Sequence, residues 1–426
     1  MSETTPQHPA TTPDPAAATP PPPRGDDSGR TGRIDREPGA PAAHVLAAVT
    51  ELAPLVREQA AACDRDRSLP RPVLDALVET GLFTLLDPHD GETARLLDFF
   101  AAVRTIASAS ASVGWVAAML GTAAWHVLAM DPATRQEVRG SAQTALVSVS
   151  HAPMGRLTPT DGGYVLDGEW PNLPAVDHCD WAVLTALTAR AETTPRRTNP
   201  VRVATAVVPR AQLLDGADWN TIGLRGTGSK RVSARQVFVP GHRVRRSPQP
   251  GDIAGHAVPR CPLTIVYSMA ACMPVLGAAQ GAFDGYLART ERRVALSLAG
   301  AQSVLDPAIQ AAVARGLAEI DASILQLERD LRDTSSTVAQ AIPVGTELLL
   351  RTRRDQVRAT ERAVAALELL RRMAGGEAVR EGGAIDRAWR DVNTAAAHVI
   401  NQPEPALRLY GQWAFGLDVD NEMVTI

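Results

Sequence analysis

The sequence predicts an α+β protein made of three consecutive parts: a helical segment, a segment of short strands and a second helical segment. Apolar residues recur at helical spacing over residues 44–140, whereas residues 141–250 contain short β-rich runs bounded by Gly, Pro and Asp. Residues 251–426 return to helical spacing in four long stretches. These changes of period predict an N-terminal helical domain, a central antiparallel β-domain and a C-terminal four-helix bundle.

The composition excludes some classes of partner. The 426 residues include 43 basic and 47 acidic side chains, for a net charge of −4, so there is no basic surplus for nucleic acid or an anionic membrane surface. No apolar run long enough to span a bilayer and no apolar signal core are found, so we expect a cytoplasmic protein. Residues 1–43 are rich in Pro, Ala and Thr, which predicts a disordered tail.

The first helical segment is predicted to contain three stretches of helix. It opens with HVLAAVTELAPLVREQAAACDRD, whose apolar residues have helical spacing. Pro70 or Pro72 can begin a second helix that ends near Gly81. A longer helix follows in LLDFFAAVRTIASASASVGWVAAMLGTAAWHVLAM, with a break predicted near Ser112–Gly114.

The central segment contains five strand-like runs: ALVSVS, YVLDGEW, WAVLTALTA, VRVATAVVP and ARQVFVP. Gly162-Gly163 predicts a hairpin turn, and residues 190–200 are predicted to form a polar loop. In the last segment, helices are predicted across SMAACMPVLGAAQGAFDGYLARTERRVA and over residues 307–334, 344–374 and 384–400. Four long helices are the number expected for a bundle.

No metal or nucleotide-binding motif is found. Cys63, Cys179, Cys261 and Cys272 form no CxxC pair and fit no zinc spacing, so we interpret them as reduced thiols. There is no GxGxxG after a strand, no Walker loop and no HExxH. A Rossmann-type nicotinamide site is therefore not expected.

Two distant segments carry a family resemblance. They are WNTIGLRGTGSKRVSARQVFVPGHRV at 219–244 and RAWRDVNTAAAH at 387–398. Together they resemble the acyl-CoA dehydrogenase superfamily, and more narrowly its flavin-dependent monooxygenase branch. In many of the dehydrogenases a catalytic glutamate follows the Arg-Asp pair by about eight residues. Here no carboxylate lies between Asp391 and Glu404, and His398 stands near that place.

The resemblance implies the oxygenase component of a two-component aromatic hydroxylase. Such a protein would take reduced FMN or FAD from a separate NAD(P)H-dependent flavin reductase, use O2, and hydroxylate a phenolic or polyketide aromatic. The Ala- and Arg-rich composition is typical of high-GC genomes, which use this branch in antibiotic and other natural-product biosynthesis; aromatic catabolism is the other setting. The resemblance also implies a homotetramer, because bundle helices of this superfamily pack across subunits.

Three residues are predicted to be catalytic. By resemblance, His126 faces the aromatic substrate and His398 acts as a base on its hydroxyl. Each would otherwise be a core histidine. Ser150, in SVSHAPMG, resembles the serine that hydrogen-bonds near flavin N5, with Ser148 as the rival for that role. His151 stands where the family pattern has an aromatic residue.

Trp170 and the segment Arg225, Gly226, Thr227 and Gly228 are predicted, with Ser150, to contact the flavin; a plain turn is the alternative for the glycine segment. Related oxygenases usually carry W-x-F-x-S-G after the tryptophan, whereas this chain has WPNLPA, with Pro174-Ala175 in place of Ser-Gly. Pro174 has no N–H to donate, and Ala175 has a Cβ that glycine lacks.

Three other functions remain open on the sequence. An N-oxygenase would act on an amino group in place of a phenol. An acyl-CoA dehydrogenase would need a glutamate base elsewhere, such as Glu291 or Glu368. A non-catalytic family member would be consistent with the Pro174-Ala175 substitution.

Overall fold

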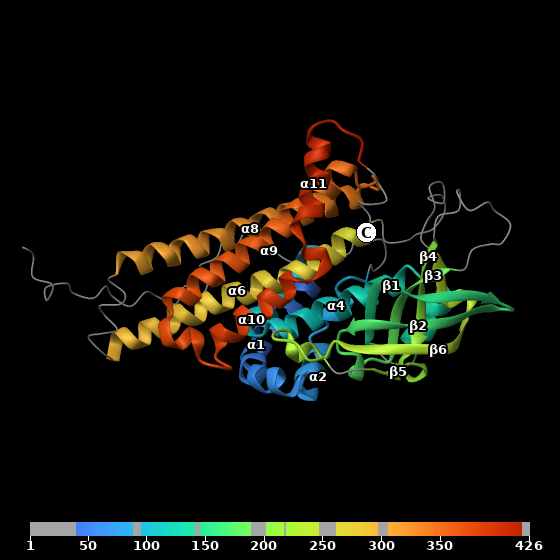
Figure 1. The fold of residues 1–426 in the computed structure, drawn as a ribbon, viewed down its shortest axis with the longest axis horizontal. Coiled ribbons are helices and arrows are strands. Elements are labelled where there is room, and N and C mark those ends of the chain that lie inside the picture. The colour runs from blue at the N-terminus through green and yellow to red at the C-terminus, as the bar shows by residue number, and fades with distance from the viewer. Residues whose placement is uncertain are drawn as a thin grey trace, which may run out of the picture. The chain divides into compact units, whose positions relative to one another are not determined.

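The computed structural model describes residues 40–87, 95–140, 145–188, 202–216, 219–246, 261–296 and 306–419 (Figure 1). Over these residues helices are followed by a sheet and then by helices again, which confirms the predicted α+β class. The predicted polar loop at 190–200 and nearly all of the predicted tail lie outside the described residues.

The N-terminal part contains helices α1 (Ala40–Asp66), α2 (Arg71–Glu79), α3 (Leu96–Ala109), α4 (Ala111–Leu128) and α5 (Pro132–Arg139). Because α1 begins at Ala40 and Ala42 is fully buried, the last residues assigned to the tail belong to this helix. The break between α3 and α4 falls at Ser110, whose backbone is extended, slightly before the predicted position. The two helices pack closely at this junction, since a Cβ at Gly114 would lie 2.4 Å from the Cβ of Ala107.

The sheet consists of β1 (Val147–Thr160), β2 (Gly163–Leu173), β3 (Trp181–Thr188), β4 (Arg202–Pro209), β5 (Leu214–Asp215), β6 (Lys230–Pro240) and β7 (Val244–Arg246). Their order is β5-β6-β2-β1-β3-β4-β7. Neighbouring strands are antiparallel except β1 and β3, which are parallel. The sheet is therefore mixed and not wholly antiparallel as predicted, because apolar alternation shows which face a strand buries but not which strand lies beside it.

A bulge interrupts the pairing of β1 with β3. Ser150 pairs with Leu184, and the next pair joins Gly155 to Ala186, so residues 151–154 lie opposite Thr185 alone. Trp170 of β2 packs against this bulge, because a Cβ at Gly155 would lie 2.1 Å from its indole ring. A bulge of this kind re-aims side chains at the point where it leaves the ladder.

The C-terminal part contains the long helices α6 (Leu263–Leu296), α8 (Pro307–Ala339), α9 (Thr346–Met373) and α10 (Ala384–Ala396). They form the predicted bundle, with α9 packed against α6, α8 and α10, and α6 also packs on α3 and α4 (Figure 1). The fourth helix ends at Ala396, short of the predicted residue 400, and a 3-10 turn at Val399–Asn401 follows. Helix α11 (Pro403–Ala414), which packs on α9, was not predicted from the sequence.

Helices α4 and α6 are apolar enough, and long enough, to match a bilayer-spanning segment by composition alone. In the fold, 89% of the apolar window of α4 and 83% of that of α6 are buried inside the protein. Both helices belong to the largest core cluster, which joins the two helical parts. Their apolar character is therefore explained by packing within the protein.

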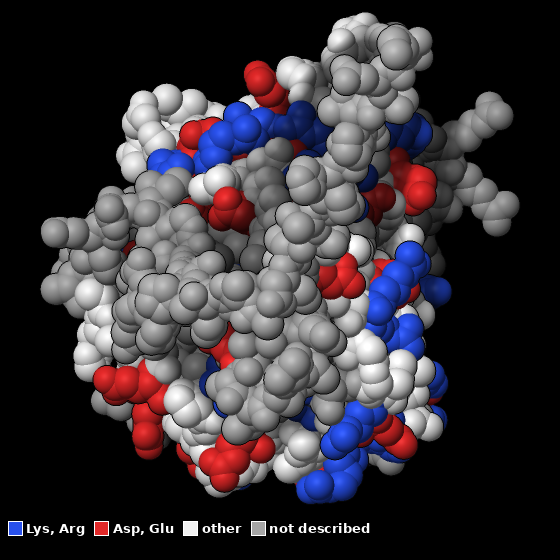
Figure 2. All heavy atoms as spheres, turned by 90° about the vertical axis from the view of Figure 1, so that its left-hand side faces the viewer, with Lys and Arg blue, Asp and Glu red and all other residues white. Residues whose placement is uncertain are grey.

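The arginine-rich helix α9 forms ion pairs with acidic residues at its contact with α8. Asp330 on α8 is fully buried and accepts hydrogen bonds from Arg329 at 3.1 Å and Arg351 at 2.9 Å. Asp355 on α9 accepts from Arg329 and Arg354, each at 2.6 Å. Figure 2 shows basic side chains gathered along the upper edge of the molecule's end face, at the height of α8 and α9 in Figure 1. These pairs neutralise Arg351 and Arg354 of α9 within the chain.

Candidate active site

Four polar aromatic side chains from four different elements meet between the sheet and helices α4, α6 and α10. His126 lies on α4, His151 in the β1 bulge, Tyr267 on α6, and His398 just after α10. Their ring centroids are 5.8 Å apart for His126 and His151, 4.4 Å for His151 and Tyr267, and 6.1 Å for Tyr267 and His398. We call these four residues the ring cluster; it brings together both histidines predicted to be catalytic.

Burial keeps the ring cluster uncharged near neutral pH. Desolvation lowers the pKa of His126 to about 3, with smaller contributions from His151 and the positive charge of Arg245. Desolvation also lowers the pKa of His151 to about 4 and that of His398 to about 4. Burial raises the pKa of the Tyr267 phenol above its usual range. Each neutral imidazole therefore offers one hydrogen-bond donor and one acceptor.

The hydrogen bonds of His398 define which of its nitrogens carries the proton. Its Nδ1 accepts the backbone N–H of Ile400 at 3.3 Å, and its Nε2 lies 3.4 Å from the Tyr267 hydroxyl. A neutral imidazole that accepts at Nδ1 has its proton on Nε2, as assigned from this network. His398 therefore points a donor into the ring cluster, whereas the sequence-based hypothesis gave it the role of a proton acceptor.

Several polar groups at this place have no partner within the described part of the chain. His126 is 8% exposed and Ser150 is 7% exposed. Neither side chain, nor that of His151, makes a hydrogen bond to another described residue. Polar groups inside a folded protein usually have partners, so open hydrogen-bonding capacity on nearly buried side chains makes this a candidate ligand site.

The two candidate serines of β1 differ in their environment. The Ser148 hydroxyl is fully buried and donates to the carbonyl O of Pro174 at 2.7 Å. Ser150 ends the regularly paired part of β1, next to His151, and keeps its hydroxyl free for a ligand. Ser148 is thus engaged in holding the β2 end, which leaves Ser150 as the better placed of the two.

Pro174 and Ala175 cannot donate backbone hydrogen bonds to a ligand. Pro174 has no N–H, and the Ala175 N–H donates to the carbonyl O of Thr227 at 2.8 Å. Ala175 has φ of 49° in the left-handed region, where glycine is usual and alanine is strained. Ala175 therefore adopts a backbone conformation that suits glycine, and neither residue has an N–H free for a ligand.

The predicted flavin-binding segment packs tightly on the N-terminal helices. Arg225 donates from Nε to the carbonyl O of Asp64 at 3.0 Å. A Cβ at Gly226 would lie 2.2 Å from the Cys63 sulfur, so only glycine fits there. The Thr227 hydroxyl lies 2.7 Å from the Ser229 hydroxyl, and the 3-10 turn ends at Gly228, which has positive φ. The hydrogen bond from the Ala175 N–H to Thr227 joins this segment to the end of β2. The neighbouring Pro174 accepts the hydrogen bond from Ser148.

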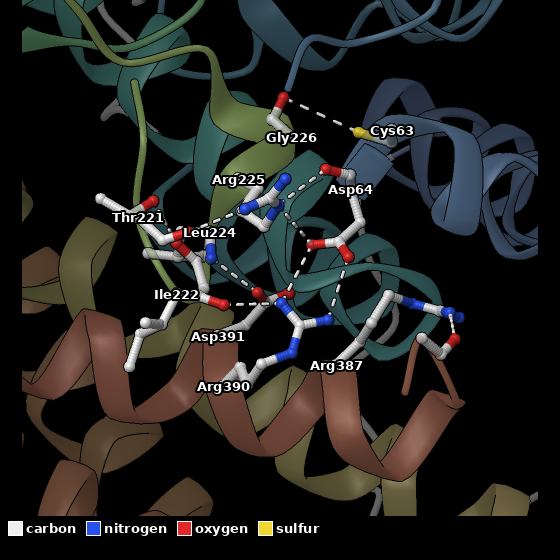
Figure 3. A network of polar contacts seen from close by, with 12 residues as sticks. Cys63, Asp64, Thr221, Ile222, Leu224, Arg225, Gly226, Arg387, Arg390 and Asp391 are labelled. Carbon is white, nitrogen blue, oxygen red and sulfur yellow. Dashed lines mark hydrogen bonds and ion pairs between the residues drawn. The ribbon is translucent and has the colours of Figure 1, made fainter. Parts of the chain in front are cut away.

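A polar network ties the same segment to α10 (Figure 3). Asp391 is buried and accepts the N–H of Leu224 at 2.6 Å. Arg390 pairs with Asp64 of α1 at 2.9 Å and donates to the carbonyl O of Ile222 at 2.6 Å. Arg390 and Asp391 therefore do not pair with each other; they fix α10, and with it the position of His398, against the loop and α1.

Trp170, predicted to contact the flavin, is fully buried in the core of the sheet and donates from Nε1 to the carbonyl O of Thr185 at 2.7 Å. Its surroundings indicate a packing role.

Sequence reasoning missed Tyr267 and gave His151 no role. Tyr267 lies among apolar residues of α6, and its phenol in an otherwise apolar stretch was the available signal.

The two glutamates considered as alternative bases lie at other places. Glu291 is exposed near the end of α6. Glu368 accepts hydrogen bonds from Trp389 at 3.0 Å and Arg372 at 3.2 Å. Within the described chain neither carboxylate interacts with the ring cluster, so neither Glu291 nor Glu368 takes the place of the missing glutamate base.

Comparison with known proteins agrees with the fold. Residues 269–403 match the family model described as acyl-CoA dehydrogenase, C-terminal domain. The flavin-dependent monooxygenase oxygenase subunit HsaA of Rhodococcus jostii RHA1 is 34% identical over 382 residues, covering 88% of this chain and 98% of that protein. The FADH(2)-dependent resorcinol hydroxylase oxygenase component of Rhizobium sp. MTP-10005 is 28% identical over 396 residues, covering 89% and 95%.

Among solved structures, the 3-HSA hydroxylase from Rhodococcus sp. RHA1 has a TM-score of 0.81 at 33% identity, covering 89% of this chain and 98% of that one. The chain therefore belongs to the acyl-CoA dehydrogenase superfamily and, within it, to the oxygenase subunits of flavin-dependent monooxygenases.

Proposed function

We propose that this oxygenase subunit hydroxylates a phenolic or polyketide aromatic at the ring cluster, with reduced flavin delivered by a separate NAD(P)H-dependent reductase. The observation that supports the proposal most strongly is the set of neutral, unpartnered polar groups at His126, His151 and Ser150 beside the donor of His398. A flat, partly polar substrate suits a site walled by aromatic rings. The resorcinol hydroxylase named above acts on a phenol, which points to the same substrate class.

His398 is proposed to bind the phenol oxygen through its Nε2–H and to favour the phenolate form of the substrate, whose proton passes to bulk water. Full transfer of a proton from a phenol of ordinary pKa to an imidazole with a pKa of about 4 would cost roughly 8 kcal/mol, which argues against a simple base. A donor aimed at a developing negative oxygen has no such cost. Electron density at the ortho and para carbons is highest in the phenolate, which is what attack by an electrophilic oxygen requires.

His126 and Ser150 are proposed to hold the substrate and the flavin, respectively. His126 can accept or donate one hydrogen bond to the substrate from α4, because its imidazole is neutral. Reduced flavin, when bound, would supply two electrons to O2, so that one oxygen atom enters the substrate and the other leaves as water. The chain fits such a group through the free hydroxyl of Ser150, while Pro174 and Ala175 supply shape without donors.

The quaternary structure and location are also proposals. We propose a homotetramer assembled through the bundle helices, as the family resemblance implies, and activity in the cytoplasm, where the reductase can supply flavin. The exposed side chains of Phe415 and Leu417 after α11 support burial against another copy, since they are 86% and 58% exposed in the single chain. Light scattering at micromolar concentration tests this, and a monomer would contradict it.

The role of His398 is tested with two variants, one without and one with a side-chain N–H donor. His398→Ala removes the donor, and we expect hydroxylation to fall by about 100- to 1,000-fold. His398→Gln restores an N–H near the position of Nε2 but cannot act as a base. We therefore expect it to hydroxylate at least about tenfold faster than His398→Ala. Product formation is measured with a phenol panel, a flavin reductase and NADH, together with released hydrogen peroxide.

The outcomes separate the mechanisms. If His398→Gln is as slow as His398→Ala, the donor role is wrong and the result favours His398 as the base that accepts the phenol proton. If both variants hydroxylate at the wild-type rate, His398 is structural. If the wild-type protein oxidises no phenol but converts an amine, the proposed substrate class is wrong.

A further inference from the structure

A row of polar side chains crosses the sheet from the ring cluster to the edge strand β7. Thr185 of β3 lies opposite the bulge that contains His151. Thr185 pairs with Thr205 of β4, and Thr205 pairs with Arg245 of β7. Side chains of directly paired residues point to the same face of a sheet, so Thr185, Thr205 and Arg245 share one face.

That face is the one covered by α4. Val183 and Val207, two residues from Thr185 and Thr205 along their strands, pack with Ala123 and Val127 of α4. Residues two apart in a strand lie on the same face. The His151 ring also meets His126 of α4 on this side. The polar row therefore runs beneath α4 and leads from the ring cluster to Arg245.

Arg245 differs from the arginines beside it on the chain. Arg243 pairs with Glu137 and stacks over the Trp181 ring at 5.0 Å, and Arg246 donates to the Tyr164 hydroxyl at 2.8 Å. Arg245 is partly buried, and within the described chain it pairs with no carboxylate and donates no hydrogen bond. Burial lowers its pKa, and its charge is close enough to His126 to help lower the pKa of that imidazole. A partly desolvated cation without a counter-ion is a place where an anionic ligand gains binding energy.

We propose that Arg245 binds a carboxylate of the substrate, so that the aromatic substrate is a phenolic acid with its hydroxyl at His398 and its acid group toward β7. This inference rests on the proposed hydroxylation of a phenol. A guanidinium matches a carboxylate with two parallel hydrogen bonds. The hydroxyls of Thr185 and Thr205 lie along the path between the two ends and can bind further oxygens of a long substrate.

The test compares acids with their neutral amides. The full chain is titrated by calorimetry under anaerobic conditions, with reduced FMN and reduced FAD in parallel. The probes are para-hydroxybenzoate, its homologues with propionate and pentanoate side chains, and the three primary amides. We expect at least one acid to bind wild type about 10- to 100-fold more tightly than its amide, the range of a charge-assisted pair. Arg245→Gln should abolish this preference and Arg245→Lys should keep part of it, whereas Arg246→Gln, on the same strand but facing away, should keep all of it.

Four other results would contradict the inference, and each identifies a different part of it as wrong. Equal binding of acids and amides by wild type would reject an anionic group while leaving the phenol site intact; this comparison needs no variant, so a poorly folded Arg245→Gln does not block it. An unchanged preference in Arg245→Gln would place the anion elsewhere. Weaker binding of reduced FMN in Arg245→Gln, with an unchanged acid preference, would mean that Arg245 holds the flavin phosphate. Failure of every acid and every amide to bind would reject the proposed phenol substrate itself.

Discussion

Replacing Asp391 with Asn should leave the protein more stable than wild type, by a margin that grows as the pH rises. Burial is the largest cause that raises the pKa of Asp391, from 3.8 to about 7, and the nearby charge of Asp64 adds to it. The unfolded chain ionises this group near pH 4, but the folded chain resists ionisation until about pH 7. A carboxyl with a raised pKa contributes stability below its unfolded pKa and loses it as the pH rises toward its folded pKa.

The size of the effect follows from the shift. The full penalty is roughly 4 kcal/mol at 1.36 kcal/mol for each pH unit, and roughly 2 to 3 kcal/mol of it develops between pH 5 and pH 8. Asn has no charge to bury, and its Oδ1 can still accept the N–H of Leu224. The difference in unfolding free energy between Asp391→Asn and wild type should therefore become more favourable to the variant by about that amount.

Urea unfolding followed by circular dichroism at both pH values measures the difference. Asp386→Asn is the matched control, because Asp386 lies on the same helix and pairs with Arg390 at a partly exposed position. It removes one carboxylate from α10 at a less buried position, so it measures what the loss of a charge on this helix contributes by itself. An Asp391→Asn difference that stays constant within about 0.5 kcal/mol would mean that the carboxylate is ionised in the fold and that its burial has been overestimated.

Further changes separate structural from functional residues. Ser148→Ala should lower the unfolding free energy by about 1 kcal/mol, through loss of its bond to Pro174, without changing the yield of product per O2 consumed. Ser150→Ala should do the reverse, with an unchanged urea midpoint and more hydrogen peroxide released; an equal effect of both serines would contradict the assignment. Trp170→Ala should lower the unfolding free energy by about 3 to 5 kcal/mol, because the indole is fully buried, and a loss below about 1 kcal/mol would contradict its packing role. Deleting residues 1–39 should leave the melting temperature unchanged, because α1 begins at Ala40, and a clear drop would show that this segment stabilises the fold.

The elements of the fold were largely predictable because local signals agree with the structure. Helical spacing and a proline before the second helix placed α1 and α2, and the Gly162-Gly163 pair placed the hairpin between β1 and β2. The parallel pairing of β1 with β3 was not predictable, since it depends on which strands meet in space. Helix α11 was missed, although Pro403 begins it as prolines often begin helices.

The candidate site was predictable only in part. His126 and His398 were predicted through the family resemblance, since each would otherwise be a core histidine, and the structure brings both into one cluster. The phenol of Tyr267 in an apolar stretch was a signal too weak to separate it from the core residues of α6, and the sequence does not show the bulge that turns His151 toward α4. Which nitrogen of His398 carries its proton also depends on the backbone N–H of Ile400, a contact that spacing alone does not reveal.

The β1 bulge has a consequence for how this scaffold can change its substrate. Residues 151–154 take no part in the β1–β3 ladder, so a substitution there breaks no interstrand hydrogen bond and shifts no register. The surrounding frame is fixed independently by Trp170 against Gly155. Position 151 thus contacts His126 and Tyr267 of the ring cluster and is not constrained by pairing in the sheet. If the ring cluster binds the substrate as proposed, a substitution at this position would change the lining of the site while the sheet around it stays the same.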